Sequence, residues 1–243
     1  MQALSFVDCH SHVVPSGDDG VGSVEEGERL CRAAARRGTG ILYATPHVWP
    51  HLVLTEAREA EVRAAYAELK PRAGLDLRLG FELTPDPRLL DQDPERYRLE
   101  GTDAVLVEVE FVGSEKLLVE VAEHIEAAGL TPVIAHPERG ESVLENPGLA
   151  DDFAERGWLL QVNATSLLGR HGPEPEELGW RLLDEGIAAL VASDGHRATR
   201  PPHLDDAHAR ARARLGQHAD RYFDGSALLR SRRPASRAAS RGA

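Results

Sequence analysis

Short apolar runs alternate with longer segments of helical period along most of the chain. Seven short runs predict strands, at residues 3–7, 40–44, 76–79, 104–107, 132–135, 159–162 and 188–192. Helices are predicted between them, at residues 23–37, 55–70, 114–128, 173–185 and 200–215. Alternation of this kind is typical of parallel strands with helices packed outside them. Seven such units favour an irregular barrel, and an open doubly wound sheet is the alternative.

Local signals mark the ends of the predicted helices. Ser23 stands at the N-cap position of the first helix with Glu26 three residues later, which predicts a capping box. Gly38 follows the last turn of this helix and predicts its end. The last predicted helix starts from a pair of prolines, Pro201 and Pro202.

Side chains that can bind metal ions or phosphate follow almost every predicted strand. In a parallel barrel these positions converge on one face, at the carboxyl ends of the strands. The residues are His10, His12, His47, Glu82, Glu108, His136, Arg139, Asp194 and His196. Carboxylates brought so close together repel, so they need shifted pKa values or a bound cation. The sequence therefore predicts a metal cluster at this face.

The ligand types restrict the metal. Imidazoles and carboxylates without thiolate exclude zinc–cysteine and iron–sulfur sites, and they fit manganese, iron, cobalt or catalytic zinc. His10 and His12 lie on one side of an extended segment because side chains alternate along a strand, whereas Cys9 points away into packing. Asp8 shares the side of His10 and is expected to orient a ligand.

Two further patterns have more ordinary explanations. Cys31 and Arg37 match the Cys-x5-Arg string of thiolate phosphatases, but the residues between them predict a plain helix instead of a phosphate-binding loop. Six histidines in loop or helix-surface contexts are expected to be structural or solvated. They are His51, His124, His171, His203, His208 and His218.

Composition excludes several classes of protein. Of 243 residues, 42% are hydrophobic and 28% are charged, as in ordinary globular proteins. The net charge of −12 argues against nucleic acid or an anionic lipid surface as the main partner. Two cysteines cannot build the disulfide framework of a secreted protein. Because neither a signal peptide nor a membrane-spanning run is recognisable, we expect a cytoplasmic location and no membrane insertion.

A single domain is predicted over residues 1–230. Residues 1–225 contain neither a recognisable linker nor an internal repeat. Residues 231–243 consist of Arg, Ser, Ala, Pro and Gly and lack any apolar period. This composition predicts a disordered, arginine-rich tail.

Eight motifs recur in an order that resembles the polymerase-and-histidinol-phosphatase (PHP) superfamily. They are Asp8-Cys9-His10-Ser11-His12, Asp18-Asp19-Gly20, Ala44-Thr45-Pro46-His47, Gly80-Phe81-Glu82, His136-Pro137-Glu138-Arg139, Gln161-Val162-Asn163-Ala164, Ser193-Asp194-Gly195-His196 and Arg200-Pro201-Pro202. Within this superfamily, the chain resembles the bacterial metal-dependent protein-tyrosine phosphatases that act with capsular and exopolysaccharide tyrosine kinases. The narrower likeness depends mainly on residues 136–139, 161–164 and 200–202.

The resemblance implies a distorted (β/α)7 barrel with three divalent metal ions, usually manganese. One ion would be held by His10, His12, Glu82 and Asp194, a second by Glu82, Glu108 and His136, and a third by Asp19, His47 and His196. Arg139 resembles the phosphate-binding arginine of the family, and Arg200 resembles a second anion contact. Glu110 stands where the family often has a proline, so Glu108 and Glu110 are both open as the ligand.

The implied reaction is hydrolysis of phosphotyrosine in a protein, with a bacterial tyrosine kinase as the expected partner. Three divalent ions outweigh the ligand carboxylates, and with Arg139 they give the positive charge that a phosphomonoester dianion needs. A metal-activated hydroxide would attack phosphorus in line, while the ions and Arg139 stabilise the equatorial oxygens. A tyrosine leaving group has a pKa of about 10, so it needs little help from a general acid.

Three alternatives remain open at this point. The same barrel could serve a small-molecule phosphatase, such as one for histidinol phosphate. It could also serve a phosphodiesterase or exonuclease, although the acidic composition disfavours nucleic acid. A metal-binding regulator without catalysis would show no turnover with added Mn²⁺, and the intact set of candidate ligands argues against it.

Overall fold

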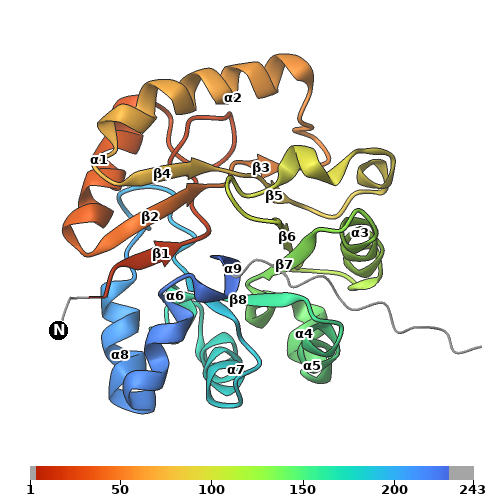
Figure 1. Ribbon diagram of the computed structural model, residues 1–243. Helices are drawn as coiled ribbons and strands as arrows, with labels where there is room; N and C mark the ends of the chain where they lie inside the picture. Colours follow the sequence, from red (N-terminus) through yellow and green to blue (C-terminus); the bar gives the residue numbers. More distant parts are fainter. Residues whose placement is uncertain (1–3, 230–243) are drawn as a thin grey trace, which may run out of the picture.

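Seven parallel strands form the centre of the structure, and helices surround them (Figure 1). The structure is a computed structural model that describes residues 4–229. The seven strands are β1 (Phe6–Asp8), β2 (Thr39–Ala44), β4 (Asp76–Leu79), β6 (Ala104–Glu108), β7 (Thr131–Ala135), β8 (Leu159–Asn163) and β9 (Leu190–Ala192). The predicted strands are therefore confirmed, with shifts of a few positions at their ends.

Two shorter strands that the sequence did not predict carry site residues. β3 (His47–Val48) extends the path of β2, and β5 (Glu82–Leu83) extends the path of β4. Pro46 has no amide hydrogen and interrupts the first ladder, but its carbonyl accepts from the Glu82 amide at 3.2 Å, so the pairing continues. The ladders run β1-β2-β4 and β3-β5-β6-β7-β8-β9, and every pair is parallel.

The ring of strands is irregular between β1 and β9. An isolated parallel bridge between Ser11 and Gly195 connects the two segments beyond the strand ends. Lower down, the amide of Val7 donates to the carbonyl of Phe223 at 2.8 Å instead of pairing with β9. The structure is therefore a distorted barrel whose hydrogen-bonded ladder is interrupted at this seam, and the alternative of an open doubly wound sheet is wrong.

Helices cover the outer side of the strands (Figure 1). They are α1 (Val24–Arg36), α2 (Glu56–Leu69), α3 (Lys116–Ala127), α4 (Glu141–Glu145), α5 (Gly148–Glu155), α6 (Ala164–Leu167), α7 (Pro173–Asp184), α8 (Asp205–Leu215) and α9 (Ser226–Leu229). Short 3-10 segments are η1 (Lys70–Arg72), η2 (Pro87–Asp91), η3 (Pro94–Tyr97), η4 (Pro137–Arg139) and η5 (Gly216–Tyr222). Within residues 4–229, every helix is too short or too polar to cross a membrane.

The five predicted helices are confirmed, but one predicted start is wrong. α8 begins at Asp205 instead of Arg200. Pro201 and Pro202 lack amide hydrogens and disfavour helical backbone in the residues before them, so the chain stays irregular up to the helix. The sequence did not predict the short helices α4, α5, α6 and α9, and the predicted tail, residues 231–243, lies outside the described residues.

Only one of the two hydrogen bonds of the predicted capping box forms at the start of α1. The Ser23 hydroxyl accepts from the Glu26 amide at 3.2 Å, as in a capping box. The Glu26 carboxylate does not return to Ser23 and accepts from the Gly22 amide at 3.0 Å. Gly38 ends the segment as predicted, with a φ of 97° in the left-handed region that favours glycine.

Two apolar layers hold the barrel together. A large layer lies between the strands and the outer helices. A smaller layer fills the inside of the barrel, with Val7, Cys9, Tyr43, Leu99, Ala104, Leu106, Val133, Ala135, Leu190, Ala192 and Leu228. Leu228 comes from α9, which lies over the middle of the strands in Figure 1. Cys9 is fully buried in this layer, as predicted, and it is a free cysteine.

The seam between β1 and β9 predicts a difference between two glycine variants. Gly225 has a φ of 70°, and an added Cβ would lie 2.7 Å from the rigid Cβ of Val7. Gly157 has a φ of 86° with nothing within 4 Å of an added Cβ. Gly157→Ala should cost about 1 kcal/mol of folding stability through backbone strain alone, and Gly225→Ala roughly 1–3 kcal/mol more through the clash. Thermal unfolding of the two variants measures the difference, and equal losses would show that the seam tolerates the extra atom.

Candidate metal centre

All nine metal ligands implied by the resemblance converge at the carboxyl ends of the strands. They fall into four overlapping groups in which the ligand atoms lie within 4.8 Å of one another. The groups are His12, Asp19, His47 and His196; His10, Glu82 and His136; His10, His12 and Asp194; and His47, Glu82 and Glu108. Each group could hold a metal ion, so side chains from distant parts of the sequence build one continuous site.

Glu82 lies at the middle of the site. Its Oε2 atom is 2.9 Å from Nε2 of His10 and 3.1 Å from both Nε2 of His12 and Nδ1 of His47. Its Oε1 atom is 3.1 Å from Nε2 of His136. Although it is buried, Oε2 has no hydrogen-bond partner among the described residues. One carboxylate oxygen faced by three ring nitrogens is the donor arrangement that a bound cation satisfies.

Asp19 forms the open side of the site. Its Oδ1 atom lies 3.1 Å from Nε2 of His196 and 3.7 Å from Nε2 of His47, and its side chain is 57% exposed. His12 lies within reach of this group as well as of His10 and Asp194. The structure therefore places His12 between two of the groups, whereas the resemblance implied one.

Glu108 belongs to the cluster and Glu110 does not. The Glu108 carboxylate is buried, accepts a hydrogen bond from the Thr84 hydroxyl, and lies 3.8 Å from ring nitrogens of both His47 and His136. Glu110 is exposed at the wall of the adjoining cavity. Burial, together with the charge of Glu82, raises the pKa of Glu108 well above its usual value.

Neighbouring acids and bases in the site have pKa values that are moved in opposite directions. Burial disfavours the charge of Glu82, but the charges of His10 and His47 hold its pKa well below the usual range. Burial opposes protonation of His12, but the neighbouring carboxylates of Asp18 and Glu82 raise its pKa to about 10. Burial lowers the pKa of His47 to about 4. Such separation within one cluster is typical of functional sites.

Two site residues have strained backbone. His136 and Asp194 have φ values of 36° and 51°, and within residues 4–229 they are the only residues other than glycine with positive φ. This region is unfavourable for ordinary side chains, and such strain concentrates at functional sites. His136 directly follows the end of β7, and Asp194 is the second residue after the end of β9. The turn at each position directs the side chain into the site.

β8 supplies hydrogen bonds that orient the cluster. Oε1 of Gln161 lies 2.9 Å from Nδ1 of His10, and its Nε2 donates to Oδ1 of Asn163 at 2.9 Å. Nδ2 of Asn163 then donates to Asp194, also at 2.9 Å. Glu138 accepts from the Asn163 amide at 3.0 Å, and burial raises the pKa of Glu138 to about 7. These residues stand in two of the motifs that carried the resemblance. Gln161 and Asn163 bond candidate ligands directly, and Glu138 holds Asn163.

Two positioning residues were not predicted from the sequence. Asp18 accepts from the His47 amide at 3.0 Å and lies 3.3 Å from Nδ1 of His12. Arg58 of α2 donates to the carbonyls of His47, Ser16 and Leu52 at 2.8, 3.1 and 2.7 Å. Asp18 could have been found from its position next to Asp19. An arginine that faces inward from a polar helix, such as Arg58, has no distinguishing sequence signal.

Asp8 orients the site differently from what the sequence predicts. Its Oδ1 atom accepts from the amides of Ser193 and His10 at 3.0 and 3.4 Å, so it holds backbone instead of an imidazole ring. Burial raises the pKa of Asp8 to about 6. Asp8 therefore ties the segment before Asp194 to β1.

The remaining candidates lie outside the cluster. Cys31 is buried in α1, and burial raises the pKa of its thiol to about 12, which is unsuited to thiolate chemistry. Of the six other histidines, His171 lies 2.9 Å from the Ser166 hydroxyl and His208 lies 2.8 Å from Asp220. None of the six enters the four groups found within residues 4–229.

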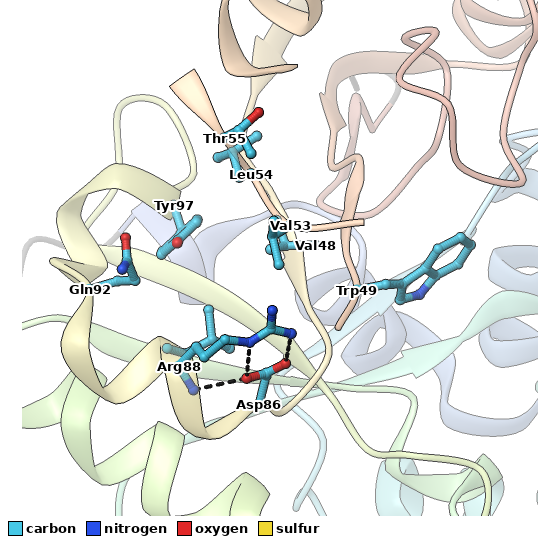
Figure 2. A pocket seen from close by; sticks show the side chains of 10 residues that line it. Val48, Trp49, Val53, Leu54, Thr55, Asp86, Arg88, Gln92 and Tyr97 are labelled. Atoms are coloured by element: carbon cyan, nitrogen blue, oxygen red, sulfur yellow. Dashed lines mark hydrogen bonds and ion pairs between the residues drawn. The ribbon is translucent and has the colours of Figure 1, made fainter. Parts of the chain in front are cut away.

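A cavity of about 410 Å³ opens above the cluster and is lined by both candidate phosphate-binding arginines. Arg139 donates to Oδ2 of Asp194 at 3.1 Å, and Arg200 lies 3.8 Å from Oδ1 of the same residue. Trp49 and Phe111 line the same cavity. A smaller pocket of about 220 Å³ shares Trp49 with it, and Figure 2 shows the indole directed away from the ion pair of Asp86 and Arg88.

Comparison with known proteins identifies the family. The family model for capsular polysaccharide synthesis, CpsB/CapC, matches residues 6–224. Tyrosine-protein phosphatase YwqE of Bacillus subtilis (strain 168) is 30% identical over 217 residues, which are 83% of this chain and 82% of that protein. The putative tyrosine-protein phosphatase CapC of Staphylococcus aureus is 30% identical over 211 residues, covering 82% of this chain and 80% of that protein.

The similarity extends to three-dimensional structure. A chain from the crystal structures of YwqE from Bacillus subtilis and CpsB from Streptococcus pneumoniae, described as unique metal-dependent tyrosine phosphatases, superposes with a TM-score of 0.82. It is 29% identical and covers 92% of this chain and 94% of the solved one. The family match includes all nine clustered residues and both arginines. The resemblance seen in the sequence is thereby confirmed, and the chain belongs to the CpsB/CapC family.

Proposed function

We propose that this protein is a metal-dependent protein-tyrosine phosphatase that hydrolyses phosphotyrosine. The observation that carries the proposal is a nine-residue cluster of imidazoles and carboxylates beneath a cavity that two arginines also line. A floor of bound cations and guanidinium groups suits a phosphomonoester dianion. The tyrosine-protein phosphatases among the relatives support the same activity.

The cofactor in this proposal is a set of three divalent ions, with Mn²⁺ preferred. The ions would be held by the ligand sets that the resemblance implies, with His12 near two of the sets and Glu82 common to two of them. Imidazole and carboxylate donors without a thiolate fit manganese, iron, cobalt or catalytic zinc. The preference for manganese comes from the family resemblance found in the sequence. When bound, the ions would supply positive charge and lower the pKa of a coordinated water towards neutrality, which provides the nucleophile.

The protein's own part in the reaction is to bind and orient the phosphoryl group. Arg139 presents two donors in a planar fork, which matches two phosphate oxygens. Its contact with Asp194 fixes the guanidinium at the cavity, and its side chain is only 16% exposed, so solvent screens its charge little. Arg200 reaches the same carboxylate and is placed to bind a further oxygen. The phenolate leaving group has a pKa of about 10 and departs without a dedicated acid.

The partner and the location follow from this function. We propose that the substrate is a phosphotyrosine protein, namely a bacterial tyrosine kinase of capsule or exopolysaccharide synthesis. The family's description as capsular polysaccharide synthesis supports this partner. Two free, buried cysteines suit the reducing cytoplasm in which we propose that the protein works. Residues 1–230 act as one catalytic domain in this proposal.

Hydrolysis by purified protein tests the proposal directly. Protein loaded with Mn²⁺ should hydrolyse a phosphotyrosine peptide, chelation should abolish the activity, and added Mn²⁺ should restore it. His136→Ala removes one proposed ligand and serves as the inactive control. Faster hydrolysis of histidinol phosphate than of the peptide would identify a small-molecule phosphatase instead. Turnover that survives chelation with no bound metal would contradict the proposal.

A matched pair of variants tests the assignment of the second ion. Glu108→Gln should raise the Mn²⁺ concentration needed for activity by about tenfold or more, because it removes a charged donor from the cluster. Glu110→Gln should leave this requirement unchanged, because the side chain is exposed outside the four groups. Metal content after gel filtration gives a reading that is independent of turnover. The reverse result would make Glu110 the ligand.

Loss of Arg139 should separate phosphate binding from metal binding. Arg139→Ala should lower turnover about a hundredfold, because it removes donors that stabilise charge on the phosphoryl oxygens. Metal content should remain at the level of the parent protein. Arg139→Lys keeps the charge without the planar fork and should recover only part of the activity. Unchanged turnover in Arg139→Ala would remove this residue from the mechanism.

A further inference from the structure

Two columns of stacked rings run from the buried histidines of the site to the wall of the cavity. In the first column, the ring centroid of His12 lies 4.4 Å from that of His47. The His47 ring in turn stacks on the indole of Trp49 at 4.3 Å with an interplanar angle of 25°. The indole also stacks on the exposed ring of His51, at 5.1 Å and 22°. The first column therefore runs from the floor of the site through Trp49 to His51.

The second column starts from the other histidine of the same pair. The His10 ring lies 5.6 Å from the ring of His136, and the His136 ring lies 5.5 Å from that of Phe111, at angles of 29° and 28°. The guanidinium carbon of Arg139 lies 4.5 Å from the centroid of Phe111. Phe111 thus packs against both a candidate metal ligand, His136, and the candidate phosphate-binding Arg139.

The two columns lie on either side of the central carboxylates. His47 approaches Oε2 of Glu82 and His136 approaches Oε1, each at 3.1 Å. The same two rings lie 3.8 Å from the two different oxygens of Glu108. Because Trp49 and Phe111 line one cavity above these carboxylates, each column contributes one aromatic residue to the cavity wall.

Burial in the core does not account for this arrangement. Phe111 is 49% exposed and its neighbour Val112 is 76% exposed, and both line the cavity. Leaving large apolar side chains in water forgoes the stabilisation that burial provides, and exposed apolar surface beside a polar site marks a place where a ligand binds. An aromatic ring held above the proposed ions would cover this surface.

We propose that Trp49 and Phe111 recognise the aromatic ring of the substrate and select aryl phosphomonoesters over alkyl ones. The inference rests on the proposed phosphatase function and adds the residues that set its specificity. With the phosphoryl group at the cluster and Arg139, the phenyl ring of phosphotyrosine projects outward between the two columns. Trp49 already stacks on His47 and His51, and Phe111 packs on His136 and Arg139. The edges of the two rings therefore offer the edge-to-face geometry that aromatic pairs prefer. Phosphoserine is too short and has no ring to make these contacts.

Binding of two non-hydrolysable ligands tests the specificity apart from catalysis. Calorimetry on the Mn²⁺-loaded protein should show that phenylphosphonate binds about tenfold more tightly than methylphosphonate. Trp49→Leu and Phe111→Leu should each remove most of this preference, because they lower the affinity for phenylphosphonate far more than the affinity for methylphosphonate. Val53→Ala is the matched control, since Val53 is an exposed apolar residue of the neighbouring pocket (Figure 2) and does not line the catalytic cavity. It should keep the parent preference.

The possible results separate the inference from the function on which it rests. Equal affinity of the parent protein for both phosphonates would overturn the aromatic recognition and leave the phosphatase function standing. Failure of the parent protein to bind either ligand would contradict the phosphatase function itself. If the leucine variants lose affinity for both ligands equally, the rings only support His47 and Arg139, and the inference is wrong. A melting temperature close to that of the parent protein shows that the variants are folded.

Discussion

The whole site depends on burying carboxylates beside imidazoles in a small volume. Glu82 is fully buried, and a charged carboxylate there has lost its hydration. Such a loss is tolerated only where positive charge or hydrogen bonds replace the water. Three ring nitrogens within 3.1 Å of one of its oxygens give part of this compensation. Divalent cations would complete it, which explains why a metal-dependent reaction suits this barrel.

The surrounding residues fix these side chains in place ahead of substrate binding. Left-handed backbone fixes the positions of His136 and Asp194. The side-chain amides of Gln161 and Asn163 on β8 orient His10 and Asp194, and the buried guanidinium of Arg58 holds the carbonyl of His47. A site held this way does not have to reorganise when charge develops in the transition state. The strain that these positions add to the folded state is therefore part of what makes the site effective.

The sequence predicted the barrel and most of the clustered residues because both follow periodic rules, whereas Asp19 was included only through the family resemblance. Apolar runs of strand length locate the seven main strands, and the ends of parallel strands meet on one face, so the pattern alone brings His10 and Asp194 together. Two-residue strands such as β3 and β5 are too short to have a period. The roles of Asp18 and Arg58 depend on tertiary contacts alone. The stacking of Trp49 and Phe111 likewise has no counterpart in local sequence.

The contacts that close the barrel between β1 and β9 also bring together residues of the site. The Asp194 amide donates to the His10 carbonyl at 3.0 Å, and the His12 amide donates to the Gly195 carbonyl at 2.7 Å. The side chains of His10, His12 and Asp194 form one of the four metal-binding groups. A cation held there would pull together the two segments whose ladder is otherwise interrupted. Because a ligand that binds only the folded state stabilises it, metal affinity and the stability of this seam are linked.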